Sequence, residues 1–445
     1  MGLEQGDMKM ALKRKCLAEL IAWKERKTTQ ALLVTGARQV GKTFTIERFG
    51  RENYEHMVTF DLIEQTDLRE ALETVRNADD LFLTLTAFAS EPLVPGRTLI
   101  FIDEIQECKE VLVLIKYLVQ RTDFDYILSG SLLGVELENV RSQPVGYLDV
   151  LELHPLDFEE FTWAAGVSST VWDAVRQSYR SREPLPDGVH KRLLNLFHQY
   201  LFIGGMPRAV DEFVRTRDVA RAKSVQDNIL ALYRMDVSKY AKGRTLLVKE
   251  AFDLIPSQLD SQAKRYTVSS LKKGGVYDRL AENFAWLVAA GVALKVNAVS
   301  EPRHPLRLAE NRSFFKLFMN DVGLLSAACG MEVAKSVLSD KLGVNYGSIY
   351  ENAVAQELKA HEFDLFYYRS HGVGELDFVV ETGQGSVLPI EVKSGKDYRR
   401  HSALDNVLSR QNYPIEYALV LCEENLLLDG KILYAPVYMA AVLER

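Results

Sequence analysis

The feature that most constrains this sequence is the glycine-rich stretch TGARQVGKT, residues 35–43, between an apolar run and a helical pattern. Gly36, Gly41, Lys42 and Thr43 follow the spacing G-x-x-x-x-G-K-T. Glycines let backbone N–H groups curl closely around an anion, and a following helix turns its N-terminal N–H groups toward the same place. A generic strand–turn–helix connection is the alternative. The residue-for-residue match of the spacing favours a phosphate-binding loop.

The residue types in this loop predict ATP and Mg²⁺ as its ligands. We expect Lys42 to reach the β- and γ-phosphates and the Thr43 hydroxyl to hold Mg²⁺. The residues expected to bind the nucleotide are Gly36, Ala37, Arg38, Gln39, Val40, Gly41, Lys42, Thr43 and Phe44.

A second apolar run, RTLIFIDEIQE at residues 97–107, ends in two acids. Residues 99–102 are almost wholly apolar, as in a parallel strand covered on both faces. A carboxylate at the end of such a strand, beside a phosphate loop, is placed to hold Mg²⁺, and a neighbouring glutamate can position or deprotonate water. We therefore expect Asp103 to bind the metal and Glu104 to act on the attacking water. An acidic turn is the alternative if this run is taken alone.

A third apolar run, DYILSGSLLG at residues 125–134, ends in Ser129 and Ser131. If its strand lies between the other two, these hydroxyls can sense the γ-phosphate or orient water. Small residues in an ordinary turn are the alternative interpretation.

The order of these three elements resembles the AAA+ branch of P-loop ATPases. The phrases TGARQVGKT, LIFIDEIQ, SGS, LELHPLDFEEF and FIGGMPRAV are similar to one prokaryotic family of AAA-type ATPases. The carboxy-terminal domain of that family (DUF4143-like) has no characterised function and often carries nuclease-like motifs. The resemblance covers nearly the whole chain. It implies ATP binding and hydrolysis and admits a homo-oligomer as a form of the protein.

Three positions bear on the nucleotide under this resemblance. In the family a Gly-Arg pair usually precedes LELHPL, whereas this chain has Tyr147 there, with Arg141 as a substitute candidate. Arg208 begins a helix after the FIGG turn, where a lid arginine can touch the phosphates. Pairing of Arg208 with surface acids is the alternative.

The middle of the chain is basic although the whole chain has a net charge of −7. Residues 241–316 contain thirteen Lys and Arg against seven Asp and Glu, a net charge of +6. Three helical patterns followed by a hairpin pattern predict a winged helix, which contacts either DNA or protein. The residues expected to meet DNA phosphates are Arg265, Lys272, Lys273 and Arg279.

The stretch GELDFVVETGQGSVLPIEVKSGK, residues 374–396, predicts a hairpin with charged groups on one face. Asp377 and Glu391 would form a carboxylate site for a second Mg²⁺ or Mn²⁺, with Lys393 orienting water. Asp followed by Glu-x-Lys resembles the PD-(D/E)xK nuclease fold, and Glu351 matches the helix acid that such nucleases often add. Surface charges on an exposed hairpin are the alternative.

These patterns predict an α/β protein with four domains. We expect a P-loop AAA+ parallel-sheet ATPase core at 1–165, a helical lid at 166–240, a winged-helix domain at 241–335 and a restriction-endonuclease-like α/β domain at 336–445.

The composition narrows the class of protein. With 47% hydrophobic and 26% charged residues, the chain has the composition of a soluble globular protein. The cysteines lie far apart with no C-x-x-C pair, which argues for a reducing compartment. No apolar run approaches the ~18 residues of a membrane span, and the amino terminus lacks the apolar core of a signal peptide. We therefore expect a cytoplasmic protein without a membrane partner.

Three functional hypotheses remain open at this point. The first is an ATP-hydrolysing AAA-type protein with a DNA-linked role. The second is a nucleotide-gated protein-interaction switch with a catalytically inactive nuclease-like docking domain. The third is a metal-dependent DNA nuclease regulated by ATP.

Overall fold

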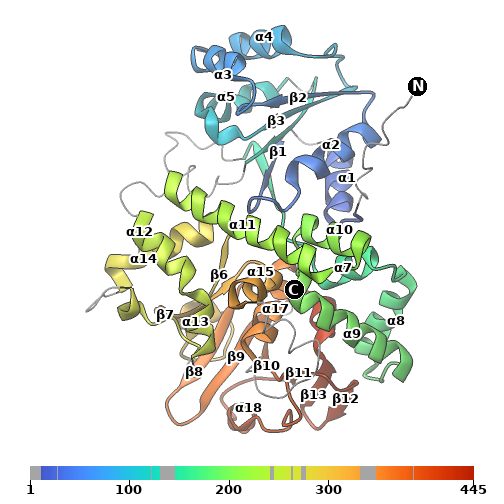
Figure 1. Ribbon diagram of the computed structural model, residues 1–445, viewed down its shortest axis with the longest axis vertical. Helices are drawn as coiled ribbons and strands as arrows, with labels where there is room; N and C mark the ends of the chain where they lie inside the picture. Colours follow the sequence, from blue (N-terminus) through green and yellow to red (C-terminus); the bar gives the residue numbers. More distant parts are fainter. Residues whose placement is uncertain are drawn as a thin grey trace. The chain divides into compact units, whose positions relative to one another are not determined.

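The computed structural model describes residues 12–27, 29–121, 123–130, 146–240, 245–261, 264–271, 277–330, 347–383 and 385–445. These residues form two compact units (Figure 1). The amino-terminal unit comprises Arg14–His154 with Ala289–Gly291. The carboxy-terminal unit comprises the described residues of Met1–Lys13, Pro155–Val288 and Val292–Arg445.

A five-stranded parallel sheet forms the centre of the amino-terminal unit. Its spatial order is β2-β3-β4-β1-β5. The strands are β1 (Ala31–Thr35), β2 (His56–Asp61), β3 (Thr98–Asp103), β4 (Asp125–Ser129) and β5 (Leu148–Glu152). Every residue of β3 is buried, because a parallel sheet is covered on both faces. The predicted α/β core with a parallel sheet is confirmed.

Helices cover this sheet on both faces. They are α1 (Cys16–Arg26), α2 (Lys42–Asn53), α3 (Thr66–Glu73), α4 (Ala78–Phe88) and α5 (Lys109–Val119), with a 3₁₀ turn η1 at Ile105–Glu107. Leucines of α3 and α4 pack with the apolar face of α5 in one core cluster. Figure 1 shows α1 and α2 on the opposite side of the sheet. Helix α2 buries Ile46 and Phe49 one turn apart, as an amphipathic helix does.

The carboxy-terminal unit contains an eight-stranded mixed sheet of order β12-β13-β11-β10-β9-β8-β6-β7. Its strands are β6 (Ala293–Val299), β7 (Glu310–Met319), β8 (Phe366–Ser370), β9 (Gly374–Thr382), β10 (Ser386–Val392), β11 (Ala418–Cys422), β12 (Leu427–Asp429) and β13 (Ile432–Pro436). The predicted hairpin of residues 374–396 is the antiparallel pair β9–β10.

The hairpin β6–β7 is part of this same sheet, because β6 pairs in parallel with β8. The segments predicted as a winged-helix domain and a nuclease-like domain therefore share one sheet. Strand β7, the second strand of this hairpin, begins at Glu310, and the residues before it, Leu306–Ala309, form the 3₁₀ turn η4. The winged-helix prediction is not confirmed.

Helices surround the sheet of the carboxy-terminal unit. They are α7 (Phe158–Ala164), α8 (Ser169–Ser181), α9 (Asp187–Ile203), α10 (Pro207–Thr216), α11 (Val219–Tyr240), α12 (Thr245–Asp253), α13 (Ile255–Asp260), α14 (Tyr277–Ala289), α15 (Val322–Cys329), α17 (Gly347–Ala360) and α18 (Ser402–Leu408), with 3₁₀ turns η3 (Val268–Ser270) and η5 (Val437–Val442). None of the described helices combines the length and apolar composition that crossing a membrane requires.

The elements α17, β8, β9, β10, α18 and β11 follow one another along the chain in the order α-β-β-β-α-β. Strands β8, β9 and β10 form an antiparallel meander, and β11 adds in parallel to β10. The relationship to nucleases stays a prediction.

Candidate functional site

The predicted phosphate loop connects the end of β1 to the start of α2. Its backbone has positive φ angles at Gly36 (+132°), Gln39 (+69°) and Gly41 (+92°). A Cβ atom on Gly36 would lie 2.2 Å from the carbonyl oxygen of Leu153. This glycine is therefore required both by the backbone angle and by the packing of the segment after β5.

Lys42 is buried beneath this loop at the first turn of α2. Its Nζ atom donates hydrogen bonds to the carbonyl oxygens of Gly36 (3.0 Å) and Ala37 (2.9 Å). Burial lowers the pKa of Lys42 to about 8, against the opposing influence of Glu104 and Asp103. Among the described residues, the partners of the ammonium group at hydrogen-bonding distance are neutral carbonyls, which leaves it suited to an incoming anion.

The ends of strands β3 and β4 and the start of helix α2 meet at the Asp103 carboxylate. Thr43 Oγ1, at the start of α2, donates to Asp103 Oδ2 at 2.6 Å, and Ser129 Oγ, at the end of β4, donates to Asp103 Oδ1. The Glu104 N–H also donates to Asp103 Oδ1, at 2.9 Å. Because β1, β3 and β4 are parallel neighbours, their carboxyl ends necessarily lie at one edge of the sheet.

These oxygen atoms fit a magnesium ion. Mg²⁺ prefers hard oxygen ligands and keeps several waters, so it needs few protein ligands. The Thr43 hydroxyl and the Asp103 carboxylate supply one neutral and one charged oxygen at the amino end of α2. Residues at this edge would therefore hold the ion beside the phosphates.

Glu104 occupies a strained position next to Asp103. Its φ angle is +54°, in the left-handed region that non-glycine residues rarely adopt. Its Oε2 atom accepts a hydrogen bond from Gln106 Nε2 at 2.5 Å, and burial raises its pKa. A raised pKa makes this carboxylate a better proton acceptor at neutral pH.

Sequence reasoning missed two residues of this site. Gln106 orients Glu104, and its place in the phrase DEIQ was the available signal. Arg14 donates from Nη1 to the carbonyl oxygen of Val40 (3.0 Å) and from Nη2 to that of His154 (2.7 Å). It ties the phosphate loop to the end of β5. No pattern in the sequence around Arg14 indicated this role, because its partners lie in other elements.

The other residues predicted to bind the nucleotide differ in burial and in position along the chain. The Phe44 side chain is exposed, whereas Val40 and Ala37 are buried. Ser131 and Arg141 lie outside the described residues. Arg208 lies in α10 of the carboxy-terminal unit, so its role in nucleotide binding stays a prediction.

The predicted carboxy-terminal acids come together around one buried lysine. Glu351 lies on α17 and Asp377 on β9, and Lys316 of β7 is fully buried between them. Lys316 Nζ lies 2.9 Å from Glu375 Oε1, 3.5 Å from Glu351 Oε2 and 3.7 Å from Asp377 Oδ1. Lys264 forms a further ion pair with Glu351. We call Lys316, Lys264 and these three acids the lysine–acid cluster.

Glu391 and Lys393 adjoin this cluster. Lys393 Nζ donates to Glu391 Oε1 at 2.8 Å, while the backbone N–H of Val392 donates to Asp377 Oδ2 at 2.9 Å. Burial, and then the charge of Asp377, raise the pKa of Glu391 to about 7. Burial and Asp377 likewise raise the pKa of Glu351.

The second metal site predicted at Asp377 and Glu391 stays a prediction, and in this structure a lysine ammonium group lies among the neighbouring acids. Burial alone would lower the pKa of Lys316, but Glu351, Asp377 and Glu375 together raise it above its ordinary value, so it stays charged. Its ammonium group occupies the place among the acids that a cation would take. The sequence signal that could have found it was the lysine in the apolar phrase SFFKLFMN.

Comparisons with known proteins agree with the geometry of the amino-terminal unit. Residues 28–162 match the family model described as an AAA domain. Residues 194–335 and 346–438 match two models described as domains of unknown function, DUF8612 and DUF4143. No curated protein sequence matches the chain.

Several solved structures resemble the chain at low identity. A Walker-type ATPase of Pyrococcus abyssi is 14% identical over 72% of this chain and 97% of its own, with a TM-score of 0.42. The ORC1 protein of Aeropyrum pernix, solved with DNA, is 14% identical over 75% and 94%, with a TM-score of 0.28. The Holliday junction branch migration motor RuvB of Thermotoga maritima is 15% identical over 66% and 90%, with a TM-score of 0.26. These three likenesses carry no functional argument, and the similarity to the AAA domain model is confined to residues 28–162.

Proposed function

We propose that this chain binds ATP with Mg²⁺ at the loop between β1 and α2 and hydrolyses it. The observation that carries the proposal is the convergence of Thr43 and Ser129 on the Asp103 carboxylate beside that loop. An acidic turn with no function would not need hydroxyl groups from two other elements on one carboxylate.

Lys42 supplies the positive charge for the β- and γ-phosphates. Exchanging its two neutral carbonyl partners for phosphate oxygens replaces ordinary hydrogen bonds by charge-assisted ones. The amino end of α2 adds its N–H groups and its dipole to the same anion. The bound phosphates would also raise the lowered pKa of Lys42 and keep it protonated.

Glu104 acts on the attacking water. Its carboxylate accepts the water proton while the water oxygen bonds to the γ-phosphorus and the bond to the bridging oxygen of the leaving diphosphate breaks. Gln106 holds Glu104 in position, and Asp103 with Thr43 holds the ion that neutralises charge on the phosphates. We assign Ser129 the role of fixing Asp103 between these groups.

Substitution of Glu104 by Gln tests this assignment. The variant should bind ATP with unchanged affinity while turnover falls by about 10²–10⁴-fold, the usual contribution of an acid–base group. Glu47→Gln is the matched control, because Glu47 pairs only with Arg51 on the surface of α2 among the contacts described. Parental turnover in Glu104→Gln would refute the role of Glu104. Loss of ATP binding in that variant would mean that the substitution disturbs the site itself.

We further propose that the carboxy-terminal unit is a docking domain that does not cleave nucleic acid. The observation that favours this function over a metal-dependent nuclease is Lys316, whose ammonium group neutralises the acids that a metal would need. Incubation with Mn²⁺ and with single-stranded, duplex and branched DNA tests the proposal. Cation-dependent cleavage that Glu391→Ala removes would overturn it.

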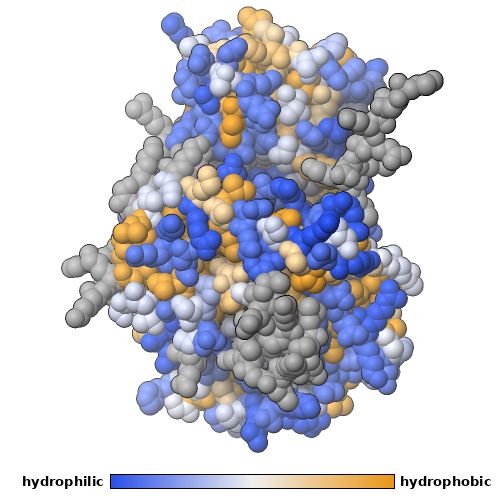
Figure 2. All heavy atoms as spheres, viewed as in Figure 1, coloured by the Kyte–Doolittle hydropathy of each residue, from blue (hydrophilic) through white to orange (hydrophobic). Residues whose placement is uncertain are grey.

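The contacts of residues 241–316 favour a protein partner over DNA. Lys272 and Lys273, which were expected to meet DNA phosphates, lie outside the described residues. Several of the described cations in this segment have intramolecular partners. Lys264 and Lys316 belong to the lysine–acid cluster, and Lys295 donates to the Tyr277 hydroxyl at 2.7 Å. Figure 2 shows a hydrophobic area over the α12 and α14 part of the visible face, where Leu246 and Val288 are exposed. A nucleotide-gated protein-interaction switch fits these features.

Measurement of ATP turnover and binding with DNA at several salt concentrations separates the two partners. A DNA-binding surface made by this segment would show affinity that falls steeply with salt, because neutralised phosphates release counterions. Removal of Lys272 and Lys273 would then flatten the slope by about one to two units. We expect neither DNA-stimulated turnover nor this salt dependence. Either result would restore the DNA-linked function.

A further inference from the structure

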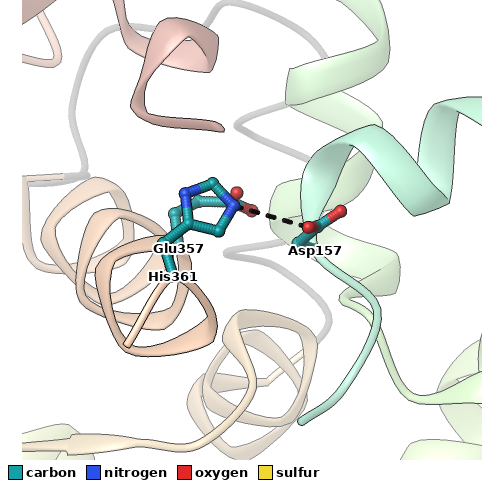
Figure 3. A group of neighbouring side chains, drawn as sticks. All are labelled: Asp157, Glu357 and His361. Atoms are coloured by element: carbon teal, nitrogen blue, oxygen red, sulfur yellow. Dashed lines mark ion pairs between the residues drawn. The ribbon is translucent and has the colours of Figure 1, made fainter. Parts of the chain in front are cut away.

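A second group of metal-ligand side chains lies in the carboxy-terminal unit, away from the lysine–acid cluster. Asp157, Glu357 and His361 each offer one ligand atom, and these atoms all lie within 4.8 Å of one another. Figure 3 shows Glu357 of α17 and His361, the residue directly after α17, side by side and facing Asp157 at the start of α7. Their i, i+4 spacing places the two on one face of the helix.

The separation between His361 and Asp157 decides between two interpretations of this group. His361 Nε2 lies 3.5 Å from Asp157 Oδ2. A charge-assisted hydrogen bond between them would be about 2.7–2.9 Å long. A tetrahedral ion with bonds of about 2.1 Å separates its ligand atoms by about 3.4 Å. The observed distance agrees with two ligands of a shared metal ion.

Hydrogen bonds from outside the group orient each of the three side chains. His361 Nδ1 lies 2.9 Å from the carbonyl oxygen of Leu443, an acceptor only. Nδ1 must therefore carry a proton in this contact, and the other ring nitrogen, Nε2, faces Asp157. A carbonyl partner of this kind is the usual outer contact of a histidine that binds a metal.

The two carboxylates are oriented by the amino end of α7. Asp157 Oδ1 accepts from the Glu160 N–H at 2.8 Å, and Glu357 Oε1 accepts from the Phe158 N–H at 2.7 Å. The other carboxylate oxygen of Asp157, Oδ2, lies toward His361 Nε2. Capping of α7 engages one oxygen of each acid, and both acids converge on the His361 imidazole.

The surroundings also favour a cation. Asp157 and Glu357 are buried, and two buried carboxylates destabilise each other unless positive charge lies between them.

We propose that Asp157, Glu357 and His361 bind one divalent transition-metal ion of the Zn²⁺ class, with water in the fourth position. One imidazole nitrogen and two carboxylate oxygens are ligands that Zn²⁺ accepts at these distances. The ion would link α7, α17 and, through Leu443, the segment after η5. This site is independent of the proposed ATP site and does not need nucleotide.

Titration of the chelator-treated, nucleotide-free full chain with Co²⁺ and Zn²⁺ tests this proposal. We expect the visible absorption of tetrahedral Co²⁺, its displacement by one equivalent of Zn²⁺, and a Zn²⁺-dependent rise of the unfolding temperature. The variants His361→Ala and Glu357→Gln should weaken binding by more than the ~10–100-fold that loss of an outer partner costs. Gln keeps an oxygen for the Phe158 N–H, so Glu357→Gln tests the ligand while leaving this cap in place.

His198→Ala is the matched control for the histidine variant. His198 Nε2 lies 3.2 Å from one oxygen of Glu423, so it also pairs with a carboxylate but belongs to no described group of three ligands. Its loss should leave Co²⁺ absorption unchanged. Thr43→Val should also leave it unchanged, which separates the site from the phosphate loop. Absence of the absorption band, or a band that survives in Glu357→Gln with undiminished affinity, would overturn the proposal.

Discussion

Replacement of Lys316 by methionine gives the sharpest test of the lysine–acid cluster. Methionine keeps most of the side-chain volume but removes the buried positive charge. Three carboxylates lie within 3.7 Å of the ammonium group, from Glu375, Glu351 and Asp377. Removing one partner from a buried ion pair costs about 3–5 kcal/mol, because the charge left behind is uncompensated. We expect a loss of free energy of unfolding within this range at pH 8.

The pH dependence of this loss follows from the pKa shifts. The pKa of Lys316 in the folded state lies above its ordinary value of 10.5, so its stabilising contribution is complete below that pH and is lost only in more alkaline solution. The pKa of Glu391 is about 7 and that of Glu351 is also raised. At pH 5 these acids take up protons more readily, so the cost of Lys316→Met should be smaller than at pH 8.

Urea unfolding of the full chain, followed by circular dichroism, measures this cost. Lys249→Met is the control, because Lys249 is an exposed lysine of α12 in the same unit. The double variant Lys316→Met/Glu351→Gln should recover part of the loss, since it removes one of the orphaned charges. Equal stability of Lys316→Met and Lys249→Met would refute the reasoning. Stabilisation of the parental protein by Mn²⁺ that disappears in Glu391→Ala would show that the acids bind a metal despite Lys316.

Two further predictions concern the phosphate loop. Gly36→Ala should abolish ATP binding and lower stability, because its Cβ atom would meet the Leu153 carbonyl oxygen at 2.2 Å. The control Gly96→Ala has a positive φ but no atom within 4 Å of the added Cβ, so it should cost only about 1 kcal/mol and leave ATP binding intact. Fluorescence titration measures the binding, and urea unfolding measures the stability. ATP affinity should fall as the pH rises above about 8, by up to ~10-fold per unit, because nucleotide-free Lys42 with its pKa near 8 must regain a proton to bind phosphate. An ATP affinity that stays flat over this pH range would show that Lys42 remains charged without ATP. The lowered pKa of Lys42 also predicts that the free energy of unfolding of the nucleotide-free protein rises as the pH rises from about 8 toward 10.5.

The sequence by itself determined the amino-terminal fold and the core of its site. The phosphate loop is contiguous, and its function depends on local backbone angles that only certain residues adopt, such as those at Gly36 and Gly41. Asp103 and Ser129 end apolar runs, and parallel strands place such ends at one edge. Local chemistry and one topological rule therefore sufficed to bring these residues together with Thr43, while their catalytic roles stay predictions.

Only the tertiary structure decided how the carboxy-terminal unit uses its charged residues. Period-2 alternation tells which residues share a face of a strand, but it does not tell which strand lies beside it. Strand β6 pairs with β8 across more than sixty residues of sequence, and this pairing carries the hairpin β6–β7 into the larger sheet. Lys316 of β7 thereby becomes the buried partner of acids from α17 and β9.

Sequence reasoning also could not find the group of Asp157, Glu357 and His361, because sequence patterns do not tell which elements lie side by side. Asp157 reads as the cap of a helix, and Glu357 and His361 read as ordinary polar residues near the end of another. Each of these interpretations is correct locally. The side chains become a candidate metal site only when packing brings α7 and α17 together. A metal site depends on the distances between ligand atoms, and the spacing of residues in the sequence fixes such distances only within a single helix or strand.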